Sequence, residues 1–312
     1  MKIALAGAGA GAAAGLLAAC IPAVDAPAAS SANPEPAPAQ TAPVSASAPN
    51  PAPAPAASGP AQFVVAGELT QGGWIRGTAP AGTVSARLGD QVLALDAAGQ
   101  FFAAFDRDAA PAAMLSATLR DGRVVQWPLA IAPRAWAIEH INTPRRPGGL
   151  SNEAYLARRR PELARIAAAR AVDSGSQGWR QSFIWPSAGR ISGRFGSQRI
   201  YQGEPDAYHS GLDMAGGAGA SYVAPADGVV VLVASEPFTL EGHLLIIDHG
   251  QGLNSAFLHS SAVLVREGDV VKQGQVIGRI GATGRVTGPH LHWSIKWRDA
   301  RLDPLLFLPP RS

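Results

Sequence analysis

A segment rich in proline, alanine and serine is the first constraint on how this chain folds. Residues 21–61 include the run NPEPAPAQTAPVSASAPNPAPAPAASGPA, which offers few side chains for a hydrophobic core. Proline-rich chains adopt extended, semi-rigid conformations and act as spacers. We therefore expect a disordered linker over residues 21–61. Folded structure is expected only after residue 61, where the chain is long enough for two cores.

The first twenty residues have the character of an export signal. One lysine precedes an apolar stretch of alanine, leucine and glycine, which is short for a membrane span and typical of a secretory signal peptide. Its ending, LAAC, resembles the lipobox of bacterial lipoproteins, in which the cysteine is acylated; the alternative is an ordinary cleaved signal with an incidental cysteine. Because Cys20 is the only cysteine, an intramolecular disulfide and a thiolate-ligated zinc site are excluded.

Residues 62–133 alternate short apolar runs with turns. The runs are QFVVAGEL, GGWIRGT, TVSARL, QVLALD, QFFAAFD, AMLSATL and RVVQWPLAI. Gly89, Gly99 and Gly122 stand in the breaks, where a positive φ suits a hairpin turn. The regular spacing predicts a small β-sandwich, loosely like bacterial immunoglobulin-type domains. It contains no histidine, so we expect a spacer or positioning module.

Residues 134–182 are predicted to be a linker with helices. SNEAYLARRR and PELARIAAARAV suggest two helices, the first capped by Ser151 and the second with Pro161 in its first turn. We expect the arginines at 158–160 to form a solvated helix face; the alternative is a patch for an anionic polymer. Residues 183–312 return to apolar runs separated by glycine-rich turns, which favours β-structure.

Five residues of this last segment carry the chemistry. The chain has seven histidines, and four of them lie in HSGLD, FLHSS and GPHLHW together with an aspartate. A hydrolytic zinc site needs three nitrogen or oxygen ligands and an open position. The set provides three such ligands and two further imidazoles that can handle protons. Its members are His209, Asp213, His259, His290 and His292.

The motifs around these residues resemble those of the lysostaphin/LytM-type zinc peptidases of bacterial cell walls. Four segments of the chain follow one another in the order of that family's motifs. They are SGRFGSQR, YHSGLDMAGGAGASYVAPADGVV, LLIIDHGQGLNSAFLHSS and VKQGQVIGRIGATGRVTGPHLHW. The resemblance implies an antiparallel β-sheet that carries the site in a groove. Together with the preceding segments, we expect a mainly β protein: a small β-sandwich, a short helical segment and a zinc peptidase domain over residues 183–312.

The resemblance also implies residue roles. His209, Asp213 and His292 would be the metal ligands of one Zn²⁺ per chain. His259 and His290 would be the catalytic pair, one taking a proton and one binding the oxyanion, in an order that the sequence does not assign. Many relatives have a tyrosine two residues before the counterpart of His259, where this chain has Phe257.

The expected function is zinc-dependent endopeptidase cleavage of peptidoglycan cross-links by a monomer in the periplasm. A lipidated Cys20 would anchor the chain to the outer membrane. Two alternatives stay open: a non-catalytic activator of another cell-wall hydrolase, and a wall-binding module of the same fold. Nucleic acid is not an expected partner, although the sequence pI is about 9.3, because basic and aromatic residues do not interleave. The glycines of IGATGRVTGPH are expected to shape the groove lip and not a phosphate site.

Overall fold

A computed structural model describes residues 59–142 and 152–311. The predicted signal peptide with Cys20, nearly all of the predicted linker and the predicted helix cap Ser151 lie outside these residues. The described part confirms a mainly β protein with antiparallel sheets. None of its helices combines the length and the apolar character that crossing a bilayer requires.

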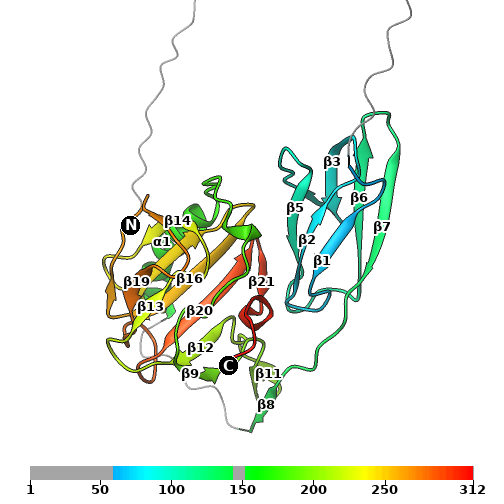
Figure 1. Ribbon diagram of the computed structural model, residues 1–312. Helices are drawn as coiled ribbons and strands as arrows, with labels where there is room; N and C mark the ends of the chain where they lie inside the picture. Colours follow the sequence, from blue (N-terminus) through cyan, green and yellow to red (C-terminus); the bar gives the residue numbers. More distant parts are fainter. Residues whose placement is uncertain (1–58, 143–151, 312) are drawn as a thin grey trace, which may run out of the picture. The chain divides into compact units, whose positions relative to one another are not determined.

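The strands before residue 131 form two antiparallel sheets (Figure 1). Gly89, Gly99 and Gly122 all have a positive φ, as the turn pattern predicted. Buried apolar side chains from both sheets, including Ile75, Phe101 and Leu115, form their core. One sheet has the order β1 (Val64–Gly67), β2 (Trp74–Thr78), β5 (Gln100–Ala104); the other has the order β4 (Gln91–Leu93), β3 (Thr83–Leu88), β6 (Ala112–Leu119), β7 (Val124–Ala130).

A large antiparallel sheet in the C-terminal half carries the candidate site (Figure 1). Its order is β18 (Val270–Val271), β14 (Gly228–Val233), β15 (His243–Asp248), β16 (Leu253–Ser260), β20 (Leu291–Trp297), β12 (Leu212–Ala215) and β9 (Arg190–Gly193), and β21 (Ala300–Leu302) also pairs with β20. β20 therefore lies near the middle, between β16 and β12.

Alternation along β20 separates a core face from a groove face. Trp293, Ile295 and Trp297 are at most 1% exposed and belong to the main hydrophobic core. Successive side chains of a strand point to opposite faces, so His292 and Lys296 lie on the other face. Because the core face is fully apolar, its burial fixes the register of β20. A slip of one residue would turn His292 from the groove face to the apolar core face.

Two smaller sheets flank the large one. One has the order β13 (Ser221–Val223), β19 (Val276–Arg279), β17 (Ala262–Val263). The other joins β11 (Glu204–Pro205) to β10 (Gln198–Tyr201), which pairs in parallel with β8 (Ile138–Ile141). β8 lies in the segment predicted to be a linker with helices, and the sequence reasoning missed it. Short 3₁₀ turns cover Gly178–Arg180 and Pro304–Phe307.

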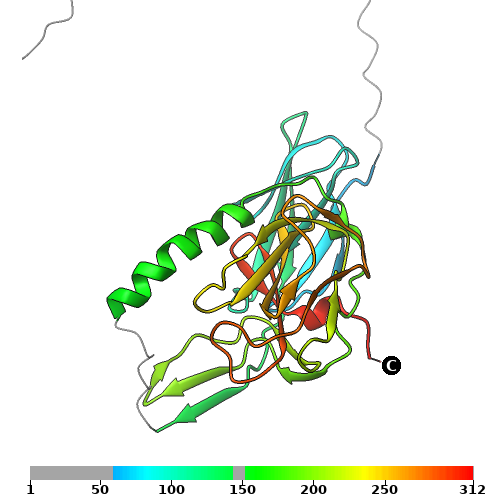
Figure 2. The same ribbon diagram turned by 90° about the vertical axis from the view of Figure 1, so that its left-hand side faces the viewer.

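The helical segment is one helix and not two. α1 runs from Asn152 to Arg170 without a break at Pro161 (Figure 2). A proline inside a helix removes a hydrogen bond and crowds the preceding turn, so tertiary contacts must compensate. Ile166 and Ala169 pack on a second apolar cluster with Leu232, Phe238, Leu244 and Ala256. This packing explains why the prediction of two helices was wrong.

The arginines of α1 are not all solvated, contrary to expectation. Arg158 and Arg160 are exposed, but Arg159 is only 6% exposed. Its Nη1 donates to Glu162 and to Glu241, both at 2.7 Å, and its Nη2 donates to Glu241 at 2.9 Å. Glu162 also accepts from the backbone and side chain of Thr239. This network attaches α1 to the hairpin loop between β14 and β15.

Replacing Arg159 with alanine should destabilise the fold. Both carboxylates would lose their cation in a half-buried setting, which costs about 2–3 kcal/mol in the free energy of unfolding. Arg160→Ala removes the same charge from an exposed position and should change stability by less than about 0.5 kcal/mol. Urea unfolding of both variants measures the difference; equal effects would contradict the structural role of Arg159.

Candidate metal centre

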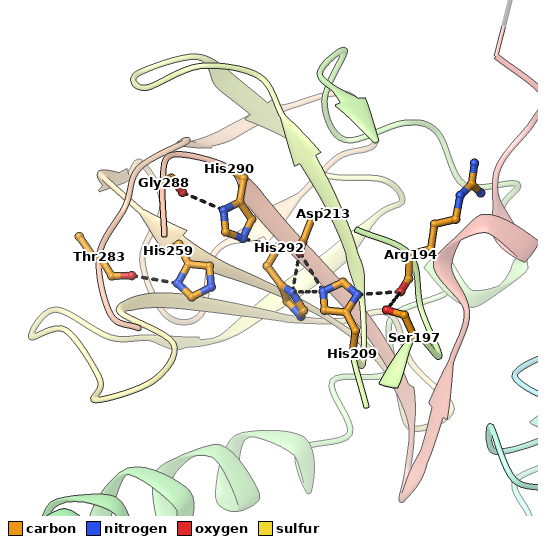
Figure 3. A network of polar contacts seen from close by, with 9 residues as sticks. All are labelled: Arg194, Ser197, His209, Asp213, His259, Thr283, Gly288, His290 and His292. Atoms are coloured by element: carbon orange, nitrogen blue, oxygen red, sulfur yellow. Dashed lines mark hydrogen bonds and ion pairs between the residues drawn. The ribbon is translucent and has the colours of Figure 1, made fainter. Parts of the chain in front are cut away.

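The sheet register places three potential metal ligands together. Asp213 in β12 is directly opposite His292 in β20, and Leu258 in β16 is opposite His292 on the other side. His209 comes from the loop before β12. Its Nε2 lies 3.0 Å from Oδ1 of Asp213 and 3.1 Å from Nδ1 of His292. The His292 Nδ1 lies 2.8 Å from the same carboxylate oxygen. Figure 3 shows the three side chains converging.

A second loop holds His209 in place. The Nδ1 of His209 donates to the carbonyl oxygen of Arg194 at 2.9 Å (Figure 3). The backbone amide of His209 donates to the carbonyl oxygen of Ser197, and the backbone amide of Gly196 donates to the carbonyl oxygen of His209. Gly196 has a positive φ and lies so close to the Trp136 ring that a Cβ there would clash. A side chain of the predicted linker thus supports the loop that orients His209.

Asp213 is held as a carboxylate by its two imidazole neighbours. Burial opposes its ionisation, but hydrogen bonds from His209 and His292 outweigh burial and keep the pKa of Asp213 far below its usual range. The contact with Asp213 raises the pKa of His209 in spite of burial. Burial lowers the pKa of His292 in spite of the same carboxylate. The site therefore has one fixed negative charge and two imidazoles of different proton affinity.

Two glycines make room for the ligands. A Cβ at Gly193, which pairs with Asp213 in β9, would lie 2.5 Å from Asp213 Oδ2. A Cβ at Gly211 would lie 2.6 Å from Nε2 of His292 and 2.6 Å from the Trp293 carbonyl oxygen. The absence of a side chain at Gly211 thus permits the close approach of the His292 ring.

The donor set suits a zinc ion. Ligand atoms of His209, Asp213 and His292 all lie within 4.8 Å of one another. Tetrahedral zinc with bonds near 2.1 Å separates its ligand atoms by about 3.4 Å, so only a small expansion of the observed cluster is required. Two imidazole nitrogens and one carboxylate oxygen match the ligand types of catalytic zinc sites, which keep a fourth position open. The residues present therefore fit the metal.

The two remaining imidazoles each present a free nitrogen to this cluster. His259 donates Nδ1–H to the Thr283 carbonyl, and His290 donates Nδ1–H to the Gly288 carbonyl, both at 2.9 Å (Figure 3). These bonds leave each Nε2 available on the opposite side of its ring. The rings lie 5.1 Å apart, and His290 Nε2 is 3.7 Å from Asp213 Oδ1. The structure thus brings all five predicted site residues together.

His259 is held in an unusual backbone conformation. Its φ is 64°, which is rare for a residue with a side chain and is often found at functional sites. The backbone amide donates to the Glu241 carbonyl at 2.8 Å, so the loop attached to α1 through Arg159 also fixes this turn. Burial, and to a lesser extent the neighbouring His292 and His290, lower the pKa of His259 to about 4. His259 is therefore neutral near pH 7.

The three other histidines of the chain lie outside the metal cluster. His249 is fully buried and bonds to the Asp227 carbonyl and the Ser255 hydroxyl, and His243 bonds to the Ala234 carbonyl. These bonds give both imidazoles a structural role outside the metal cluster. His140 is exposed on β8. Phe257 is buried and stacks on Tyr222 in the core, so position 257 faces away from the groove and a phenol there would not reach the site.

A groove surrounds the centre. It measures about 770 Å³ and is lined by His209, Asp213, His259 and His292, together with Arg285 and other residues. The sequence reasoning missed Gly193, Glu241 and Thr283, which position the ligands and imidazoles. A single sequence gives no signal for Gly193 or Glu241, because glycines and surface-type glutamates occur throughout the chain.

Comparison with known proteins identifies the domain that carries this geometry. Residues 207–304 match the model of Peptidase family M23, so the chain contains an M23 peptidase domain, as the motifs indicated. The peptidoglycan DD-endopeptidase ShyB of Vibrio cholerae is 39% identical over 97 residues. The murein hydrolase activator NlpD of Escherichia coli is 35% identical over 133 residues. These matches cover 31% and 43% of this chain, but only 22% and 32% of the relatives' lengths.

A solved structure shares the fold over a larger part of the chain. A Pseudomonas aeruginosa protein assigned to peptidase M23 superposes with a TM-score of 0.57 at 26% sequence identity. The superposition covers 77% of this chain and 95% of that structure. The similarity therefore extends beyond the 98-residue span of the family match, from 207 to 304, into the segments that precede it.

Zinc binding should release a proton from His209. Both ring nitrogens of His209 face oxygen acceptors, and the hydrogen bond with Asp213 raises its pKa in spite of burial. Zinc must displace the Nε2 proton. Below the pKa of His209, we expect about one proton released per zinc and an apparent affinity that falls about tenfold per pH unit of acidification. Calorimetry in buffers of different ionisation enthalpy counts these protons.

The acidic end of the same titration is the decisive part. Above the pKa of His209 the ring is already neutral, and protons released there come from the solvent ligand, whose pKa zinc lowers. A proton count near zero at the acidic end would contradict displacement of the His209 proton by the metal.

Proposed function

We propose, from the M23 peptidase domain at residues 207–304, that this chain is a zinc-dependent endopeptidase that cleaves the peptide cross-links of peptidoglycan. One observation carries the proposal: His209, Asp213 and His292 converge, and two further imidazoles lie beside them with Nδ1 bonded to a backbone carbonyl and Nε2 left for other contacts. A purely structural histidine cluster has no need for both features. A metal hydrolase needs both, because it must bind the ion and move protons.

His209, Asp213 and His292 would hold the zinc ion. When bound, zinc supplies Lewis acidity, which polarises a scissile carbonyl and lowers the pKa of water. The hydrogen bond from His209 to Arg194 fixes the ring so that its Nε2 points to the metal, a common way in which proteins orient a metal-binding imidazole. Gly193 and Gly211 allow Asp213 and His292 to approach closely enough.

His259 suits the role of general base. Its Nδ1–H is committed to Thr283, and its pKa of about 4 leaves Nε2 unprotonated near neutral pH. Nε2 can take a proton from the attacking water and then give it to the leaving amine. His290, whose Nδ1–H is committed to Gly288, would in its doubly protonated form donate from Nε2 to the carbonyl oxygen as it becomes negative. We propose this order for the two roles that the sequence left open.

A relative supports the proposed substrate, and the N-terminal sequence supports the proposed location. The relative ShyB is a peptidoglycan DD-endopeptidase, which supports a peptide cross-link as the bond that is cut. The signal-like residues 1–20 and the LAAC ending support export and lipid anchoring through Cys20. The proline-rich segment 21–61 would then act as a spacer between the outer membrane and the wall. A formal net charge of +3 suits an anionic wall polymer.

A second candidate function is activation of another cell-wall hydrolase. The relative NlpD is a murein hydrolase activator, and it matches a longer stretch of the chain than ShyB does. An activator does not require metal ligands. Their presence here in a zinc-compatible arrangement favours the endopeptidase.

Purified protein should release fragments from sacculi, and His292→Ala should not. Loss of His292 removes a ligand and leaves the carboxylate of Asp213 with only one imidazole, so zinc content should fall to near zero and turnover by at least roughly 10³-fold. Mass spectrometry identifies the released muropeptides, and metal analysis measures zinc. His140→Ala, at an exposed histidine of β8, is the matched control and should behave as wild type.

The outcomes separate the two functions. Equal digestion by wild type and His292→Ala would contradict the proposed mechanism. If wild type digests nothing alone but stimulates another hydrolase equally with or without His292, the activator function would replace it.

Glutamine substitutions should distinguish the two catalytic imidazoles. A glutamine amide can donate a hydrogen bond but cannot take up a proton. His259→Gln should therefore lower kcat roughly 10²- to 10⁴-fold, while His290→Gln keeps most of the activity and His290→Leu loses about 10²- to 10³-fold. Zinc content should stay at one per chain in all three variants. Tolerance of glutamine at 259 with a large loss at 290 would reverse the assignment.

A further inference from the structure

A second cavity extends from the candidate metal centre along β20. It measures about 960 Å³ and shares Ser210, Leu240, Glu241, Leu258 and His292 with the groove around the centre. At its far end it is lined by Arg170 of α1, Lys296 of β20 and Arg301 of β21. Nothing in the zinc site or the catalytic pair uses these three cations.

Lys296 and Arg301 are placed where like charges repel. They are direct cross-strand partners in the antiparallel pair of β20 and β21. Like charges directly opposite each other destabilise a sheet. Within the described residues neither of them, nor Arg170, forms an ion pair. The guanidinium of Arg301 lies 5.4 Å from the centre of the Tyr208 ring. The carboxylates of Asp299 and Asp106 lie near enough to act on Lys296, and that of Glu241 near enough to act on Arg170.

Arg170 adds a buried donor without a partner. Its Nη1 is inaccessible to solvent and makes no hydrogen bond to any described residue. Burial, and to a lesser extent the nearby Arg301, lower the pKa of Arg170 to about 10. Burial likewise lowers the pKa of Lys296, with Arg170 as the next cause. A buried guanidinium nitrogen without an acceptor is costly, and an anion between these three cations would remove that cost.

The distance along β20 relates the three cations to the candidate metal centre. His292, Ser294 and Lys296 follow one another on the groove face of β20, and each residue of a strand advances about 3.3 Å. Lys296 therefore lies about 13 Å along the strand from His292, a distance that an extended peptide covers in about four residues. A peptide bound along β20 with its scissile bond at the metal would reach the cations with a group three or four residues away.

We propose that Arg170, Lys296 and Arg301 form a subsite that binds a free carboxylate of the peptide substrate. The proposal rests on the proposed function, since it assumes that a wall peptide occupies the groove. In a peptidoglycan cross-link one stem has used its terminal carboxyl group to form the amide, but the other stem, which supplies the amine from a side chain, keeps its own terminal carboxylate. A carboxylate can accept hydrogen bonds from a guanidinium and an ammonium group at once. The subsite would select cross-linked stems with a free end and orient them along β20.

Binding of two matched probes tests the subsite. The probes are a fluorescently labelled cross-linked muropeptide dimer with a free terminal carboxylate and the same dimer with a terminal carboxamide. The protein is the full chain with zinc and His259→Gln, so that neither probe is consumed. Fluorescence anisotropy should show about tenfold tighter binding of the carboxylate probe, the effect of one charge-assisted hydrogen bond.

Charge-removing variants assign the preference to these residues. Lys296→Met and Arg301→Gln should each reduce the preference to less than about twofold; Arg301 is exposed, so its variant should fold even if Lys296→Met does not. Arg190→Met is the control, because Arg190 is exposed in β9 and lines neither cavity. It should keep the full preference.

Equal binding of the two probes by the parent chain would overturn the subsite. So would an equal loss of preference in Arg190→Met, which would indicate a general effect of net charge. Failure of the proposed hydrolase would appear separately, as an absence of cleavage by the wild-type protein. The anisotropy measurement does not depend on cleavage and keeps the two outcomes distinct.

Discussion

The burial of one face of β20 sets the position of His292 and, through strand pairing, that of Asp213. Trp293, Ile295 and Trp297 are packed in the core, so the opposite face of the strand must carry His292 and Lys296. Antiparallel pairing with β12 then sets Asp213 opposite His292. Hydrophobic burial thus provides the free energy that holds the carboxylate and the imidazole at hydrogen-bonding distance. Without this pairing, the burial of either polar group would be costly.

A second layer of contacts controls the imidazoles. The Arg159–Glu241 ion pair attaches α1 to the loop whose Glu241 carbonyl receives the His259 amide. Thr283 then receives Nδ1–H of the His259 ring. A helix that has no group in the metal cluster therefore contributes to the orientation of the proposed base. The same helix ends at Arg170, in the cavity that continues along β20.

Most of the strands and the set of five site residues could be predicted from the sequence because they depend on local signals; β8 was missed, and the individual roles came from the family resemblance. Alternating apolar residues, turn glycines and the HLH spacing are readable in one chain. The remaining features depend on contacts distant in sequence. The continuity of α1 through Pro161 comes from packing on β14 and β15, the burial of Arg159 comes from Glu241, and the need for Gly193 comes from the Asp213 carboxylate opposite it. None of these partners is adjacent in the chain.

X-ray absorption at the zinc K-edge of the purified full-length protein tests the central claim most directly. The account predicts one zinc per chain with nitrogen and oxygen ligands near about 2.0–2.1 Å, no sulfur ligand and solvent in one position. Substitution of His209 should remove one imidazole signal or the metal itself. A folded protein that takes up no stoichiometric zinc, or that binds it equally well without His209, Asp213 and His292, would contradict the account.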